Sequence, residues 1–276
     1  MNSFRTTALM AGMLVLFALI GQALGGTGGM LLAFVIAVGM NGVSYWYSSS
    51  IVLRMYGAEE VSRAEAPELH DLVDRLRRRA DLPMPKVCII PQDQPNAFAT
   101  GRNPENAVVA VTEGIMDVLE RDELAGVIAH ELAHIKNRDM LTSTVAATLA
   151  GAITMLSRFA LFFGGRDNNF LVSLLMMILA PMAAMLIQSA ISRSREYAAD
   201  REGAEIAKNP LGLASALRSM ERAAEHRPMQ ANQTTSHMFI VNPFSGGLSG
   251  MKRLFSTHPP TEERIARLEE MAGRAQ

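Results

Sequence analysis

The longest uncharged stretch of the chain lies near its N-terminus and predicts a pair of membrane-spanning helices. Between Thr6 and Leu53 there is no charged side chain, and a cluster of glycines over residues 25–29 divides this stretch into two apolar arms. The arms cover Thr7–Leu24 and Met30–Tyr47. Each is close to the ~20 residues that a helix needs to cross the hydrocarbon core of a bilayer. We therefore expect an N-terminal helical hairpin in the membrane.

The charges and aromatic rings that border this hairpin predict its orientation. Arg5 precedes it and Arg54 follows it, whereas the glycine turn carries no charge. Trp46 and its neighbouring tyrosines gather at the end of the second arm, where amphipathic rings favour the interface. Because cytoplasmic loops carry an excess of Lys and Arg, both outer ends should be cytoplasmic. A cleavable signal peptide is an alternative for the first arm, but the second arm would still return the chain to the cytoplasm.

Two further apolar runs, Met140–Phe163 and Phe170–Ile191, predict a second hairpin that begins and ends on the same side. Arg158 lies near the far end of the first run, where its side chain can extend to the interface. Pro181 would kink the second run, which neighbouring helices can accommodate. We expect this hairpin to span the bilayer. A hairpin buried in protein is the alternative, and in either case both ends emerge together.

The segment between the hairpins has the pattern of a soluble α+β unit. A helix with Pro67 in its first turn precedes strand-like runs at Lys86–Ile90 and Val108–Val111, and a short helix is expected at 113–119. Small, β-prone residues between the two runs predict an exposed sheet edge, which could hold an extended substrate as an added strand. A plain β-loop is the alternative. The substrate-binding candidates are Asn96, Ala97, Phe98 and Ala99.

A helix that begins near Arg121 carries the sequence His-Glu-Leu-Ala-His at residues 130–134. His130 and His134 are one helical turn apart, so both imidazoles lie on one face and can bind one metal ion. Glu131 borders that face, from which its carboxylate can take a proton from a water molecule held by the metal. The pattern indicates a catalytic zinc ion with Glu131 as the general base.

A third ligand is expected on a helix predicted over residues 193–207, where Glu196 and Asp200 lie one turn apart. The two histidines precede the second apolar hairpin and Glu196 follows it, so all three side chains can meet at one membrane face. Three protein ligands leave one position of zinc open, which is typical of catalytic sites. We assign Glu196 to the metal and expect Asp200 to accept the second ring N–H of a ligating histidine.

Composition narrows the class of protein. The 276 residues are 49% hydrophobic and 19% charged with a net charge of −1, which argues against nucleic acid as a partner. The single cysteine, Cys88, excludes an internal disulfide and lies in an apolar run typical of a buried strand, so we expect an inert thiol. The predicted fold is a mainly α integral-membrane protein in which transmembrane helices accompany an α+β zincin catalytic domain with a small β-sheet.

Four segments follow from this pattern of apolar and polar stretches. Residues 1–53 form the N-terminal transmembrane pair, and residues 54–139 form the first part of the catalytic domain with the metal-binding helix. Residues 140–191 form the second hairpin, and residues 192–276 form the second part of the catalytic domain with the third ligand.

Several motifs together resemble one known family. They are the paired N-terminal arms, Pro95–Gly101, His130–His134, Ser192–Asp200, and Leu254–Thr261 running into Ile265. Over nearly its whole length the chain resembles the HtpX group of integral-membrane zinc metalloproteases. This group is related to the CAAX prenyl proteases and the mitochondrial Oma-type proteases.

The resemblance implies a gluzincin-like catalytic domain that faces the cytoplasm from the bacterial inner membrane, in a multi-pass protein. It implies one zinc ion per chain on His130, His134 and Glu196, with Glu131 as the general base. It further implies an endopeptidase that cleaves misfolded or damaged membrane proteins without ATP, in membrane quality control and the stress response. The expected partners are membrane-protein substrates, the lipid bilayer and other quality-control proteases.

Two residues near the C-terminus are assigned on this resemblance. His258 precedes a proline and could donate to the oxyanion of the tetrahedral intermediate, with Arg264 nearby on a helix predicted over Thr261–Met271. A histidine ahead of an ordinary capped helix is the alternative. Asp139 is expected to cap the helix that enters the membrane at Met140, and contact with the zinc surroundings is the alternative.

A non-enzymatic function is a rival interpretation. A membrane scaffold or metal-handling protein that binds zinc would need the histidines and Glu196 but would have no use for Glu131. A transporter would place polar groups inside the apolar segments, and Asn41 and Gln188 are too few to support one.

Overall fold

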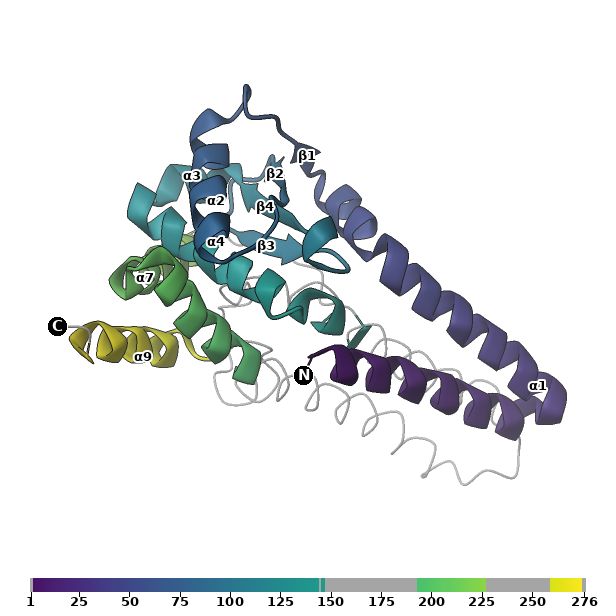
Figure 1. Cartoon of the computed structure of the whole chain (residues 1–276). Coiled ribbons are helices and arrows are strands. Elements are labelled where there is room, and N and C mark those ends of the chain that lie inside the picture. Colours follow the sequence, from purple (N-terminus) through teal and green to yellow (C-terminus); the bar gives the residue numbers. More distant parts are fainter. Residues whose placement is uncertain (1, 144, 147–192, 227–258, 275–276) are drawn as a thin grey trace.

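The chain forms a long helical hairpin that extends from a mixed unit of helices and a small sheet (Figure 1). The computed structural model describes residues 2–143, 145–146, 193–226 and 259–274. Most of the predicted hairpin at 140–191 lies outside the described residues, and so does His258. The spanning of the bilayer by that hairpin and the predicted domain boundaries therefore stay predictions.

α1 (Asn2–Tyr56) contains both predicted N-terminal arms, which are joined at a break in the helix (Figure 1). Gly25 has φ −145° and ψ 24°, and Gly26 has φ 58° and ψ −149°. The conformation of Gly26 is open essentially to glycine alone, because a Cβ atom would clash with the backbone. The predicted glycine turn is confirmed.

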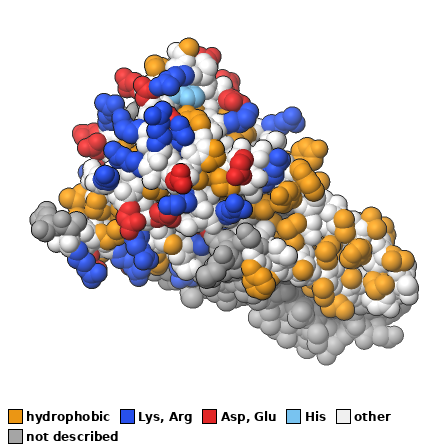
Figure 2. Space-filling view, viewed as in Figure 1, with side chains coloured by type: hydrophobic (Ala, Val, Ile, Leu, Met, Phe, Trp, Pro, Cys, Tyr) orange, Lys and Arg blue, Asp and Glu red, His pale blue; other side chains and the backbone are white. Residues whose placement is uncertain are grey.

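The hairpin exposes a large apolar surface. Among the described residues, Gly25–Tyr47 is a helix long and apolar enough to cross a membrane, and Thr6–Gln22 is a shorter apolar helix. Val15, Leu31 and Val35 are 59%, 58% and 65% exposed. Figure 2 shows the hairpin as a hydrophobic surface without charged side chains, whereas charges cover the visible part of the α/β unit. Such a surface is expected to contact lipid or protein instead of water.

The sheet contains the two predicted strands and two more. Its order is β1-β2-β4-β3, in which β2 and β4 run parallel and β3 runs antiparallel to β4. The strands are β1 (Glu59–Glu60), β2 (Lys86–Ile90), β3 (Ala97–Thr100) and β4 (Val108–Thr112). The segment for which a plain β-loop was the alternative is therefore strand β3, and it lies at an edge of the sheet as the first interpretation predicted.

The two faces of the sheet pack against different partners, as the alternation of side chains along a strand requires. Val87, Val109 and Val111 face the helical layer and belong to the main hydrophobic core. Side chains on the opposite face of the sheet, including Cys88 of β2 and Phe98 of β3, pack against the C-terminal end of α1. The second arm thus continues past its apolar stretch and covers one face of the sheet.

The helical layer on the other face brings distant parts of the chain together. Its helices are α2 (Pro67–Arg79), α3 (Glu113–Val118), α4 (Arg121–Lys136), α7 (Pro210–His226) and α9 (Thr261–Arg274), and a further helix covers residues 193–207. A short 3-10 helix (Pro104–Asn106) precedes β4. α4 packs against β3, α2 and α7, and α7 packs against α9.

The helices predicted to begin near residues 67, 121 and 261 are all present, and so are those predicted over residues 113–119 and 193–207. α9 is longer than expected. α7 was not predicted from the sequence. Its fully buried residues Leu213, Leu217 and Met220 recur at helical spacing, so the signal for this helix was present in the chain.

Candidate metal centre

α4 is fixed at its N-terminus by a capping box and by hydroxyl groups of α7. The Glu123 side chain accepts a hydrogen bond from the backbone N–H of Glu120 at 3.0 Å. Its other oxygen accepts hydrogen bonds from Ser215 and Ser219 of α7, at 2.5 and 3.1 Å. This end of α4 is therefore held in place, while the C-terminal half of the helix carries the metal-binding residues.

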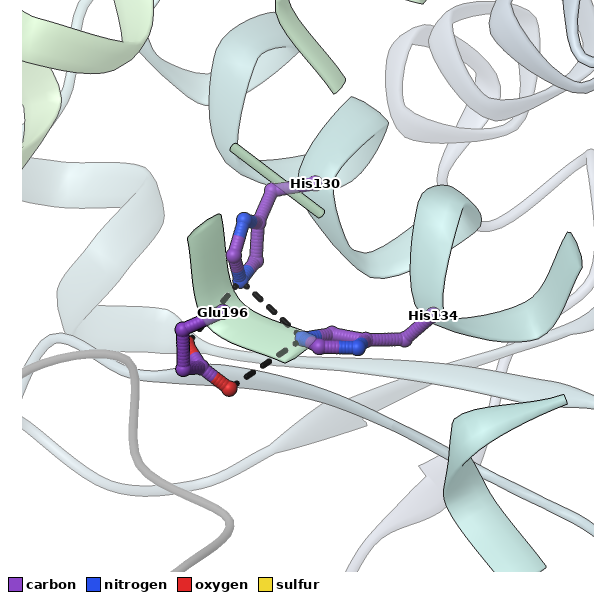
Figure 3. Close-up of side chains that lie close together, drawn as sticks. All are labelled: His130, His134 and Glu196. Atoms are coloured by element: carbon purple, nitrogen blue, oxygen red, sulfur yellow. Dashed lines mark hydrogen bonds and ion pairs between the residues drawn. The ribbon is translucent and has the colours of Figure 1, made fainter. Parts of the chain in front are cut away.

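The predicted ligands converge on one point (Figure 3). The Nε2 atoms of His130 and His134 lie 3.2 Å apart. Oxygens of Glu196 lie 3.6 Å from the Nε2 of His130 and 3.5 Å from that of His134. Metal bonds of about 2.0–2.1 Å at tetrahedral angles place ligand atoms about 3.3 Å apart, so the three side chains fit one zinc-sized ion. The arrangement is compatible with metal binding.

Each histidine contacts a carboxylate through its other ring nitrogen. Asp200 Oδ1 lies 3.0 Å from the Nδ1 of His130, so the structure selects His130 as the histidine expected to contact Asp200. Asp139 Oδ2 lies 3.1 Å from the Nδ1 of His134. Carboxylates at these positions fix the tautomer and orientation of metal-binding imidazoles.

The contact of Asp139 decides between its two predicted roles. We expected a helix cap first, and the structure instead supports the alternative, a position next to the metal ligands. α4 ends at Lys136, and Arg138 has a positive φ of 56°, which turns the chain back. The next helical residues begin at Asp139, whose side chain points at His134.

Arg264 lies deeper in the site than predicted. Its side chain is 1% exposed, and its Nε and Nη2 donate to the two carboxylate oxygens of Asp200 at 2.9 and 2.7 Å. Its Nη1 lies 3.8 Å from Glu196 Oε2. The guanidinium thus contacts the ligand Glu196 and the carboxylate of Asp200. Its contribution to an oxyanion site stays a prediction, as does that of His258.

The charges of the cluster shift its ionisation. Burial raises the pKa of Asp200, but the charge and hydrogen bonds of Arg264 outweigh it and lower that pKa to about 2. Burial lowers the pKa of His134, yet the bonds to Asp139 and Glu196 outweigh it and raise that pKa to about 10. Burial also raises the pKa of Glu131. The metal-free cluster therefore holds protons that a cation would displace.

Glu131 links the cluster to the edge strand. Its Oε2 accepts a hydrogen bond from the backbone N–H of Ala99 at 2.7 Å. In an antiparallel pair the backbone groups of alternate residues face the partner strand, so those of Ala97 and Ala99 face away from β4. Asn96 pairs with Thr112 and Phe98 packs under the sheet near Tyr56. Of the four substrate candidates, the alanines therefore direct backbone groups away from β4, although Ala97 is buried and the N–H of Ala99 is bonded to Glu131.

Sequence reasoning missed the residues that hold the 193–207 helix against α4 and α2. Glu202 pairs with Lys136 at 2.8 Å and accepts a hydrogen bond from Asn137 at 2.6 Å. Arg79 of α2 donates to the carbonyl oxygens of Ile206 and Ala207, at the end of the 193–207 helix. These contacts have no local sequence signal, because each joins residues that are far apart in the chain.

Together, the His-Glu-x-x-His helix, the third ligand on a second helix and the adjacent edge strand define a metalloprotease. The chain belongs to peptidase family M48, whose family model matches residues 63–272. This assignment confirms the predicted enzyme class and fold class.

The similarity to known proteins extends over the full length of the chain. The chain is 97% identical over 276 residues to "Protease HtpX homolog" of Salinibacter ruber (strain DSM 13855 / M31), with 100% of each chain covered. It is 55% identical over 278 residues to the protein of that name from Gemmatimonas aurantiaca (strain DSM 14586 / JCM 11422 / NBRC 100505 / T-27), and the match covers 99% of this chain and 100% of the relative. The likeness to these proteins bears out the resemblance to the HtpX group.

A solved structure shares the fold. The crystal structure of S. mikatae Ste24p matches with a TM-score of 0.55 and 18% sequence identity. The match covers 94% of this chain and 62% of that chain, so the present protein corresponds to part of the longer one.

Proposed function

We propose that this protein is a membrane-bound zinc endopeptidase with one zinc ion per chain, held by His130, His134 and Glu196. The observation that carries the proposal is the approach of Glu196 to the two histidines. Its Oε2 lies 3.6 Å from His130 Nε2, its Oε1 lies 3.5 Å from His134 Nε2, and the two Nε2 atoms lie 3.2 Å apart. Two imidazoles and one carboxylate are a donor set typical of catalytic zinc. The membership in peptidase family M48 supports the same function.

The mechanism assigns the acid–base steps to Glu131. A zinc ion held by His130, His134 and Glu196 would supply a Lewis acid that polarises the scissile carbonyl and lowers the pKa of a water molecule to about 7. The Glu131 carboxylate takes the proton of the attacking water and passes it to the nitrogen of the departing amine. Its burial supports this role, because burial raises the pKa of the carboxyl and makes it a better base.

The edge strand supplies a place for an extended substrate. The backbone groups of Ala97 and the carbonyl of Ala99 face away from β4 and can pair with a peptide added as a further strand, while the N–H of Ala99 is bonded to Glu131. Ala99 also touches Glu131, so a peptide on this edge lies next to the base. The small alanine side chains leave room for the backbone of the substrate to approach.

The membrane determines which substrates reach the site. The exposed apolar hairpin of α1 and the predicted second hairpin support a multi-pass protein of the bacterial inner membrane, with the catalytic unit in the cytoplasm. His134 precedes the apolar run at Met140 by little more than one turn, which corresponds to a zinc position about 10 Å from the membrane surface. Misfolded or damaged membrane proteins, cut in loops near the bilayer during stress, are the substrates that fit this position.

Glu131→Gln tests the enzyme against the scaffold alternative. Peptide cleavage should fall by about 10²–10⁴-fold while bound zinc stays near one per chain, because the amide cannot accept the proton. Glu68→Gln, the same change at an exposed glutamate of α2, is the matched control. Unchanged cleavage in Glu131→Gln would contradict Glu131 as the general base, and a wild-type protein that binds zinc without cleaving peptide would support the scaffold.

Cysteine labelling tests the orientation. Burial raises the pKa of Cys88 to about 11, so the native thiol should give little background. In sealed cells, the new thiol of Thr27→Cys in the turn should react with an impermeant reagent. The new thiol of Ser62→Cys should react only after the inner membrane is opened. The reverse pattern would contradict a cytoplasmic catalytic unit.

A further inference from the structure

We propose that Arg264 is a positioning residue that sets the geometry of the metal ligands, and that α9 holds the site together through it. The inference rests on the proposed zinc function. It assigns to a side chain of the C-terminal helix a role distinct from direct contact with the substrate. Four observations about contacts, burial and charge carry it.

One guanidinium contacts two residues of the 193–207 helix and reaches α4 through one of them. Arg264 binds both oxygens of Asp200, and its remaining terminal nitrogen lies 3.8 Å from Glu196 Oε2. Asp200 in turn lies 3.0 Å from the Nδ1 of His130 on α4. Arg264 therefore contacts one ligand directly and a second ligand through Asp200. A displacement of this side chain would move two of the three metal ligands.

The charges of the site require a buried cation. Glu131, Glu196, Asp139 and Asp200 are all buried, and each contacts a histidine of the site or directly follows one in the chain. Arg264 is the buried cation among the described residues that binds Asp200 through two parallel hydrogen bonds. A planar guanidinium fits a carboxylate in this way, and a lysine ammonium does not. The fork thus fixes the orientation of Asp200 as well as balancing its charge.

α9 is independently fixed beside the third ligand. Arg267 lies over the ring of Tyr197, 3.7 Å from its centroid, and Tyr197 directly follows Glu196 in the chain. α9 also pairs with α7 through Arg218 and Glu269. Since α7 packs on α4, the helix that carries Arg264 is positioned against both sources of ligands.

An oxyanion donor and a positioning residue predict different measurements. A group that contacts the oxyanion lowers kcat when removed and leaves the affinity for zinc unchanged. A group that orients ligands lowers the affinity for zinc, because the remaining ligands no longer share one geometry. The buried contacts of Arg264 with Asp200 favour the second outcome.

The experiment compares Arg264→Lys with Arg274→Lys in the full-length protein in detergent. Zinc affinity is measured by competition with a chromophoric chelator, and the zinc coordination shell by X-ray absorption. Arg264→Lys should bind zinc about 10–100-fold more weakly, with a disordered or altered shell. Arg274→Lys keeps a cation at an exposed position on the same helix, away from the ligands, and should match the wild type.

The double variant Arg264→Gln/Asp200→Asn keeps the test decisive if Arg264→Lys does not fold. It removes both buried charges, so the fold should persist while zinc affinity stays below wild type. Wild-type zinc affinity and coordination in either variant would overturn the inference. Failure of the wild-type protein to bind zinc would instead overturn the proposed function, and the two failures are therefore distinguishable.

Discussion

Gly203 lies directly against the backbone of His130. A methyl group added at Gly203 would lie 2.8 Å from both the Cα and the backbone nitrogen of His130. This close approach brings the helix of Glu196 against the helix of the histidines. It explains a glycine in the middle of the 193–207 helix, where its low helix propensity would otherwise be unfavourable.

Gly203→Ala should therefore separate the two ligand-bearing helices. We expect a loss of about 1–3 kcal/mol in the free energy of unfolding from overpacking, together with weaker zinc binding. Thermal unfolding with and without zinc measures both effects. Gly273→Ala, on α9 with open space around it, is the control and should leave stability unchanged or slightly higher. Equal behaviour of the two variants would contradict the role of this contact.

Asp139 should contribute to metal affinity through His134. Asp139→Ala removes the carboxylate that lies 3.1 Å from the Nδ1 of His134, and zinc affinity should fall by about 10–100-fold. Asp139→Asn keeps an acceptor without the charge and should lie between this variant and wild type. Asp117→Ala, at an exposed position of α3, is the control for each measurement with the chelator. Full zinc affinity in Asp139→Ala would return Asp139 to the role of a helix cap.

Zinc binding should release protons at neutral and mildly alkaline pH. Burial favours the neutral ring, but Asp139 and Glu196 outweigh it and raise the pKa of metal-free His134 to about 10. Zinc binds the neutral ring, so at any pH below this pKa the binding of zinc must displace a proton. The apparent affinity for zinc should therefore rise as the pH rises from 7 towards 10.

Titration calorimetry in buffers of different ionisation enthalpy measures the protons released. At pH 8, Asp139→Ala should release fewer protons than wild type, because it loses a contact that raises the pKa of His134. An observed enthalpy that does not depend on the buffer would sink this prediction.

The first apolar arm should be coupled to the helical residues after α4. Thr6 and Thr142 are buried, and their hydroxyl oxygens lie 2.6 Å apart. Replacement of either residue by valine should destabilise the protein by about 0.6 kcal/mol, the average for hydrogen bonds between membrane helices. A double-mutant cycle of unfolding in mixed micelles should show non-additive effects. Strictly additive effects would exclude a direct interaction, and Thr27→Val in the exposed turn is the control.

Much of the fold follows from local patterns. The glycine turn of α1, the helix of α2, the parallel strands β2 and β4 and the helix over 193–207 all lie where the sequence placed them. Each depends on periodicity, proline or glycine within one element, and these are properties of neighbouring residues. The identity of β3 as strand instead of loop depended on its pairing with β4, which no single segment contains.

The sequence by itself determined the chemistry of the site. His130 and His134 share a face because a helix repeats every 3.6 residues, and the same periodicity placed Glu196 and Asp200 together. The convergence of these two pairs could be predicted because a hairpin, as expected for the intervening apolar runs, would return the chain to one side.

Only the tertiary structure decided what surrounds the ligands. The turn at Arg138 directs Asp139 to His134, the packing of α9 brings Arg264 to Asp200, and Gly203 sets the distance between the helices. These contacts depend on how whole helices are oriented and packed. Orientation and packing arise from many distant side chains at once, and for that reason no local pattern in the chain encodes them.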